Sequence, residues 1–136
     1  MSPADRGRVA ALDLGEVRTG VAVSDPAGVI ASPLEVIPSG DLSAYLRTLV
    51  DERGVHEVVV GVPRTLGGEV GFQARKVLAR LDALRREFPG VRFVEWDERF
   101  TTRLAGRPGR RRGNVSVDHL AAARMLQEYL EARENR

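Results

Sequence analysis

Three acidic residues stand at the boundaries of predicted structural elements, where carboxylates can meet. Asp13 closes an alternating apolar segment typical of a β-strand, Glu98 follows a second such segment, and Asp118 lies in the first turn of a predicted helix. Each has an ordinary structural explanation, as a turn-capping residue, a surface acid or an acid favoured by a helix dipole. Together they could also hold a divalent cation, because carboxylate oxygens are the ligands that Mg²⁺ and Mn²⁺ prefer.

The composition excludes several other kinds of site. The chain has no cysteine, which rules out disulfides, thiol nucleophiles and Cys-ligated zinc, and makes a cytoplasmic location the expectation. His56 and His119 are the only histidines, too few for a His-rich metal centre. No Ser-His-Asp or Cys-His system is indicated, so we expect no covalent intermediate. His119 could shuttle a proton beside Asp118 or serve only as a surface or capping residue.

Basic residues gather in one segment although the formal net charge is only +2. The segment 99–117 contains six arginines and no acid, a local field suited to phosphate groups. The candidates for nucleic-acid contact there are Arg99, Thr101, Thr102, Arg110, Arg111 and Arg112, with Arg18 as a further candidate beside Asp13. The arginine run could instead be a solvated surface, and the threonines could cap a short segment.

The hydrophobic pattern predicts an α/β fold that would position these residues. The expected strands cover residues 8–14, 19–24, 29–37, 57–62 and 91–96. Helices are expected from Asp41 or Ser43 to Gly54, along Val77 to Phe88, and from a cap at Ser116. Short connections predict an antiparallel meander for the first three strands, and helical crossovers predict two parallel strands added beside a central first strand. The result is a five-stranded mixed sheet with helices packed on it.

The length indicates a single domain. We expect residues 1–136 to form one compact domain, with disordered tails at 1–7 and 132–136 and a mobile loop rich in Arg and Gly at 106–115. No apolar run approaches the length of about 20 residues that spans a bilayer, and the first residues lack the apolar core of a secretory signal. Neither a membrane nor export is therefore expected.

Four motifs, in order, resemble those of the YqgF/RuvX family of RNase H-like nucleases. Asp13-Leu14-Gly15, continuing to Ser24-Asp25, resembles the family's D-x-G…G-V-A-x-S-D opening. The later matches are Val60-Gly61-Val62-Pro63 to V-G-x-P, Asp97-Glu98-Arg99-Phe100-Thr101-Thr102 to D-E-R-x-[ST]-T, and Val117-Asp118-His119-Leu120-Ala121-Ala122 to V-D-x-x-A-A. The resemblance runs from about Val9 to Leu130, and the ordered set is more specific than any one motif.

The resemblance implies an RNase H-like fold and a metal-dependent endonuclease. Asp13, Glu98 and Asp118 would form the catalytic acidic triad, holding Mg²⁺ or Mn²⁺, with two ions expected. Three converging carboxylates should repel one another, so at least one raised pKa is expected without metal. The implied substrates are the precursor of 16S ribosomal RNA, trimmed at its 5′ end in ribosome biogenesis, and the Holliday junction of DNA recombination and repair. Paired cuts in a junction would favour a two-fold homodimer.

The sequence departs from the family's pattern at three places. The loop that usually reads P-L-N-M-D-G is here Pro63-Arg64-Thr65-Leu66-Gly67-Gly68. The segment between Thr102 and Asp118 is shorter than usual, and Glu16 replaces a common Thr. The first two departures leave loop contacts with substrate open, and Glu16 could alter metal binding or have no effect.

Two other functions are compatible with parts of the sequence. A non-catalytic module could bind RNA or DNA through the Arg-rich loop alone. An ATP phosphotransferase related to the actin-like fold could use Asp13-Leu14-Gly15 and the following hairpin at a phosphate. Such enzymes close two domains around a nucleotide, and the length of this chain suits only one.

Overall fold

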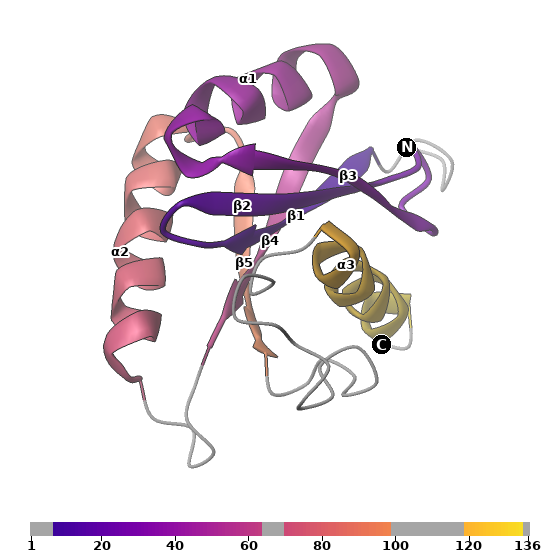
Figure 1. The fold of residues 1–136 in the computed structure, drawn as a ribbon. Helices are drawn as coiled ribbons and strands as arrows, with labels where there is room; N and C mark the ends of the chain where they lie inside the picture. The colour runs from indigo at the N-terminus through magenta and orange to yellow at the C-terminus, as the bar shows by residue number, and fades with distance from the viewer. Residues whose placement is uncertain (1–6, 64–69, 99–118, 135–136) are drawn as a thin grey trace.

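The computed structural model describes residues 7–63, 70–98 and 119–134, which form a sheet with helices on both faces (Figure 1). The elements are β1 (Arg8–Leu14), β2 (Arg18–Ser24), β3 (Ala31–Pro38), the short 3-10 helix η2 (Ser39–Asp41), α1 (Leu42–Arg53), β4 (Val55–Val62), α2 (Phe72–Glu87), β5 (Arg92–Asp97) and α3 (His119–Glu134). The predicted strands and helices are present, with ends displaced by a few residues. The predicted cap at Ser116 and the 106–115 loop lie outside the described residues.

The sheet has the order β3-β2-β1-β4-β5, as the sequence predicts. β1 pairs antiparallel with β2, which pairs antiparallel with β3, whereas β4 is parallel to both β1 and β5. At the centre, Leu12 lies opposite Val21 on one side and Val60 on the other. The carboxyl ends of β1, β4 and β5 therefore meet at one edge of the sheet.

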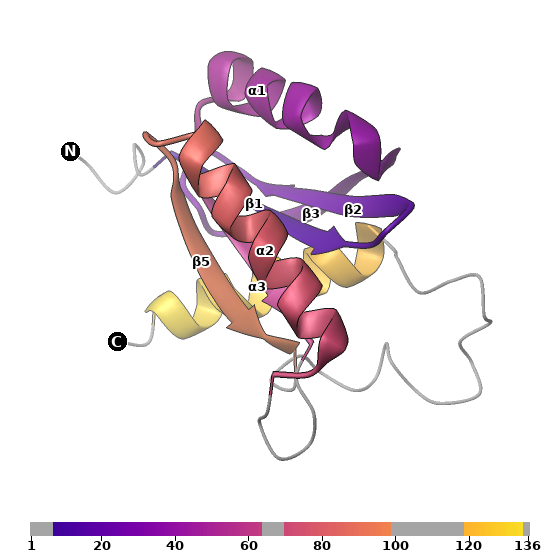
Figure 2. The same ribbon diagram turned by 90° about the vertical axis from the view of Figure 1, so that its left-hand side faces the viewer.

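The helices divide between the two faces (Figures 1 and 2). α1 and α2 bury their apolar sides against one face, in a core that includes Leu12, Leu46 and Leu81. Of the described helices, only α3 packs on the other face, where Leu126 and its neighbours cover Val59. Because β4 is covered on both faces, all of its residues from Val58 to Val62 are apolar and buried. None of the described helices is long and apolar enough to cross a membrane.

A buried carboxylate anchors α3 to the start of β4. The Glu57 side chain is only 7% exposed, and it accepts hydrogen bonds from Tyr129 Oη at 2.6 Å and from Arg133 Nη1 at 3.0 Å. Arg92 Nε lies 3.3 Å from the same carboxylate. A buried acid is tolerated only with such partners. Burial and the nearby Glu57 carboxylate raise the pKa of Tyr129 to about 12.

The same contacts correct the expected carboxyl-terminal tail. Residues 132–134 were predicted to lie in a disordered segment that begins at residue 132, but they form the last turn of α3. Arg133 fixes this turn by donating to Glu57 and, through Nη2, to the Gly28 carbonyl at 3.2 Å. The sequence of this polar segment gives no sign of the contact, because Glu57 lies far away in the chain.

Replacing Tyr129 with Phe should lower the free energy of unfolding by about 1.5 to 3 kcal/mol, since it removes a hydrogen bond to a buried carboxylate. Tyr45→Phe is the matched control, because Tyr45 Oη donates to Glu35 at 3.0 Å in an exposed contact. Its loss should be under about 1 kcal/mol. Urea denaturation followed by circular dichroism measures both, and equal losses would contradict the anchoring role of Glu57.

Candidate active site

Asp13 and Glu98 lie at the edge where the parallel strands end. Asp13 is on the face of β1 that carries Val9 and Ala11, the face covered by α3. Glu98 follows β5 directly, and its side chain folds back over Gly61 of β4. A Cβ atom at Gly61 would lie 2.7 Å from Glu98 Oε2. The glycine thus makes room for a carboxylate one strand away from Asp13.

Asp13 and Glu98 line one large cavity together with residues of one side of α2. Its volume is about 1180 Å³. The lining residues are Asp13, Leu14, Gly15, Glu16, Val17, Arg18, Ser39, Gly40, Pro63, Phe72, Gln73, Lys76, Val77, Ala79, Arg80 and Glu98. The cavity therefore combines acids at the edge of the sheet with cations on β2 and α2, a pairing suited to a phosphodiester and a metal ion.

The turn after Asp13 is held by donors from two other elements. The Gly15 carbonyl accepts a hydrogen bond from Ser39 Oγ at 2.6 Å and another from Arg80 Nη1 at 3.1 Å. Ser39 Oγ also lies 2.9 Å from Thr19 Oγ1, and both hydroxyls are buried. Since a hydroxyl carries one proton, Ser39 gives its proton to Gly15 and accepts that of Thr19. This network fixes the backbone two residues beyond Asp13.

Glu16 and Lys76 form an ion pair across the cavity. The Lys76 ammonium donates to Glu16 Oε2 and lies 4.6 Å from the centre of the Phe72 ring. The hydrogen bond from Lys76 holds the pKa of Glu16 below its usual value. Glu16, which departs from the family's pattern, is thus a partner of α2.

The structure brings together some of the predicted site residues. Asp13, Glu98 and Arg18 share the cavity, and Arg18 begins β2 with an exposed side chain. The others, namely Asp118, Arg99, Thr101, Thr102, Arg110, Arg111 and Arg112, lie outside the described residues. Over residues 7–63, 70–98 and 119–134, no three His, Asp or Glu side chains are grouped to hold a metal. Asp118, the predicted third acid, is absent from that set.

The direction of α3 bears on the third acid. Met125 lies against Gly61 near the end of β4, while Tyr129 and Arg133 reach Glu57 near its start. α3 therefore runs antiparallel to β4, and its first described residue, His119, lies toward the edge where Glu98 is. The acidic edge of the sheet and the start of α3 belong to the same side of the molecule.

The cavity also contains residues that the sequence analysis missed. Lys76 and Arg80 on α2, together with Phe72, recur at intervals of four, which is a detectable helical spacing. Gly61 interrupts a valine run, a signal of close approach by another group. Ser39 gave no signal in the sequence, because its partner Gly15 is brought to it by the folding of the meander.

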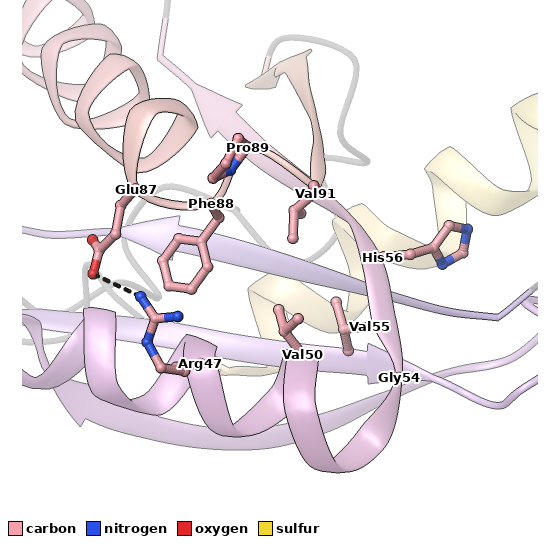
Figure 3. Close-up of a pocket in the computed structure, with 10 residues that line it drawn as sticks. Arg47, Val50, Gly54, Val55, His56, Glu87, Phe88, Pro89 and Val91 are labelled. Carbon is pink, nitrogen blue, oxygen red and sulfur yellow. Dashed lines mark hydrogen bonds and ion pairs between the residues drawn. The ribbon is translucent and has the colours of Figure 1, made fainter.

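A second, smaller cavity lies at the opposite edge of the sheet (Figure 3). It has a volume of about 460 Å³ and lies where α1 and α2 end, beside Val55. Arg47 pairs there with Glu87 at 3.5 Å and lies 4.7 Å from the centre of the Phe88 ring. Arg47 and Glu87 thus neutralise one another in this small cavity. Asp13 and Glu98 line the large cavity and not this one.

Comparison with solved structures shows an RNase H-like fold. The Thermus thermophilus RuvC structure matches with a TM-score of 0.57 and 18% identity, covering 94% of this chain and 96% of RuvC. T. thermophilus RuvC in complex with a Holliday junction substrate matches with a TM-score of 0.56, also at 18% identity, covering 95% and 96%. This likeness shows the fold alone. The candidate site rests on the residues of this chain.

The chain belongs to the RuvX family, whose model is described as "Holliday junction resolvase" and matches residues 7–132. A relative from Rubrobacter xylanophilus is 67% identical over 96% of both chains. Another, from Desulforudis audaxviator, is 42% identical over 94% of this chain and 96% of its own. Both carry the name "Putative pre-16S rRNA nuclease". The family resemblance in the sequence is confirmed, and the chain is a nuclease by family.

Substituting Gly61 with Ala should reduce cleavage roughly 100-fold, because the added Cβ displaces the Glu98 carboxylate and small misplacements of reacting groups are costly. Gly90→Ala is the control, since a Cβ there meets nothing within 4 Å. Both variants should unfold within a few degrees of the wild type. Initial cleavage rates and thermal unfolding measure the effects. Full activity in the Gly61 variant would show that the position of Glu98 is unimportant.

Proposed function

We propose that the chain is a divalent-metal-dependent endonuclease that hydrolyses a phosphodiester of structured nucleic acid at the acidic edge of the sheet. The observation that supports it is the Glu98 carboxylate folded over Gly61 in the cavity that Asp13 also lines. Two carboxylates that line one cavity at the ends of parallel strands offer the oxygen ligands that a divalent cation prefers.

The donor set suits Mg²⁺ or Mn²⁺. Asp13 offers carboxylate oxygens from β1 and Glu98 from the residue after β5, and Asp118, which precedes α3 in the sequence, is proposed to supply the third carboxylate. Two such ions, when bound, would supply an activated water and neutralise charge on the phosphoryl oxygens. Neither of the two histidines is needed as a ligand in this proposal.

The residues of the chain would perform the remaining tasks. Arg18 and Arg80 line the cavity near Asp13 and would bind phosphate oxygens of the substrate. The network of Ser39 and Thr19 would hold the Asp13 carboxylate in place through the Gly15 carbonyl. Arg99, Thr101, Thr102 and the arginines 110–112 are proposed as further contacts to the nucleic acid.

The proposed substrate is the precursor of 16S rRNA, processed at its 5′ end in the cytoplasm. The name of the relative that is 67% identical supports this choice. The second candidate is the four-way DNA junction, which the description of the family model supports. A junction needs paired cuts on two strands, so that activity would favour a two-fold homodimer, whereas trimming one RNA end would not.

With Mg²⁺ or Mn²⁺ present, the wild type should cleave RNA that carries the 16S leader faster than a four-way DNA junction. Asp13→Asn and Glu98→Gln should each lower the rate at least about 100-fold, because charge stabilisation at the reacting phosphate is lost. Asp51→Asn, an exposed acid on α1, is the control and should retain full activity. Gel-resolved cleavage products measure the rate.

A direct measurement of metal binding accompanies this experiment. Titration of Mn²⁺ into the protein, followed by electron paramagnetic resonance, should show weaker binding in the Asp13 and Glu98 variants than in Asp51→Asn. No cleavage of either substrate, with Mn²⁺ binding equal in all variants, would refute the proposal. Faster cleavage of the junction would support the proposed nuclease activity but show that the DNA junction, and not the RNA precursor, is the substrate.

A further inference from the structure

One side of α2 forms a regular wall of the large cavity. Phe72, Lys76 and Arg80 follow one another at intervals of four residues, and all three line the cavity that holds Asp13. Residues four apart on a helix lie on one side, about 6 Å apart along its axis. The adjoining side of α2, which includes Val77 and Leu81, is buried against the sheet, and Val77 also lines the cavity. We call Phe72, Lys76 and Arg80 the α2 stripe.

The stripe leads toward the proposed cleavage site. At one end, Arg80 donates to the Gly15 carbonyl, two residues beyond Asp13. A guanidinium carries five N–H donors, and this bond uses one of them. In the middle, Lys76 faces the loop of Glu16. Two cations in a row, in the cavity that Asp13 also lines, can follow the phosphates of a strand as it reaches the acids.

The far end of the stripe is an exposed aromatic ring. Phe72 begins α2 and is 65% exposed, although it is large and apolar. The ring borders the cavity and has the Lys76 ammonium 4.6 Å from its centre. A groove that combines cations with an exposed aromatic ring is the arrangement by which proteins hold unpaired nucleic acid, because bases stack on the ring while cations follow the backbone. A base inside a duplex is already stacked between its neighbours and cannot use such a ring.

We propose that the α2 stripe binds one unpaired strand of the substrate, with phosphates at Arg80 and Lys76 and a base stacked on Phe72. The inference rests on the proposed nuclease function, and it specifies that the substrate reaches Asp13 and Glu98 as a single strand. Stacking is tolerant of sequence, so the stripe selects for lack of pairing and not for particular bases.

Glu16 competes with the strand for Lys76. The two side chains are paired in the structure, so a phosphate that binds Lys76 must replace the Glu16 carboxylate. Removing the charge of Glu16 should therefore strengthen binding, while removing the charge of Lys76 should weaken it. Opposite effects at two residues of one ion pair are not expected from a pair that only stabilises the fold.

The test measures binding without cleavage, in EDTA, by fluorescence anisotropy of a short labelled single-stranded RNA and of its blunt duplex. Phe72→Ala should weaken binding of the single strand about tenfold and leave the duplex unchanged, and Phe72→Trp should retain the wild-type affinity. Lys76→Gln should weaken binding and lower the slope of log K against log salt by about 0.7. Glu16→Gln should strengthen binding severalfold.

Two controls match the variants in type and exposure. Arg86→Gln removes an exposed cation from the last turn of α2, and Ile30→Ala trims an apolar residue that is 57% exposed and does not line the cavity. Both should bind as the wild type does. Thermal unfolding of every variant checks that the fold is retained.

The outcomes separate this inference from the proposed function. If Phe72→Ala weakens the duplex and the single strand equally, or weakens neither, the stripe does not bind an unpaired strand, whether or not the wild type cleaves with metal. If the single-strand effects appear as expected but no substrate is cleaved with Mg²⁺ or Mn²⁺, the stripe stands and the nuclease proposal fails. Glu16→Gln and Lys76→Gln acting in the same direction would overturn the competition.

Discussion

Parallel pairing of β4 with both β1 and β5 is the constraint on which the site depends. Parallel strands end at the same edge of a sheet, so residues that follow them meet although they are far apart in the chain. β4 lies between the two acid-bearing strands and must be apolar on both faces, which its valines satisfy. From Val58 to Val62 only Gly61 interrupts the valines, and it lies beneath the Glu98 carboxylate.

A second carboxylate contributes to the architecture from the opposite edge. Glu57 lies near the start of β4, where Tyr129 and Arg133 of α3 bind it. These contacts fix the orientation of the helix, and Met125 packs near the end of the same strand. The start of β4 therefore aligns α3 through Glu57, which is bonded to side chains of that helix. The other end of β4 borders the large cavity. The two acids differ in position: Glu57 is buried among arginine and tyrosine side chains, whereas the half-buried Asp13 lines the large cavity.

The sequence predicted the sheet well because its evidence is local. Alternation of apolar residues located the strands, and the need for a helix between parallel strands selected the topology. The pleat also placed Glu98 on the face of Val94 and Trp96, where α3 packs. Contacts made by helices after they pack could not be predicted in this way: Arg80 meets Gly15, and Arg133 meets Glu57, across long separations in sequence. The arginines and threonines predicted between residues 99 and 112, and Asp118, stay predictions.

The composition of the cavity wall has a chemical consequence. Of the 21 basic residues counted as Lys or Arg, Lys76 is the only lysine, so the chain carries a single side-chain primary amine. That amine is at the centre of the α2 wall, beside an aromatic ring and an acid. Arginine does not react with the acylating reagents that modify amines, because its guanidinium stays protonated. An amine-directed fluorophore or cross-linker would therefore modify one side chain in addition to the α-amino group, and that side chain lies inside the large cavity.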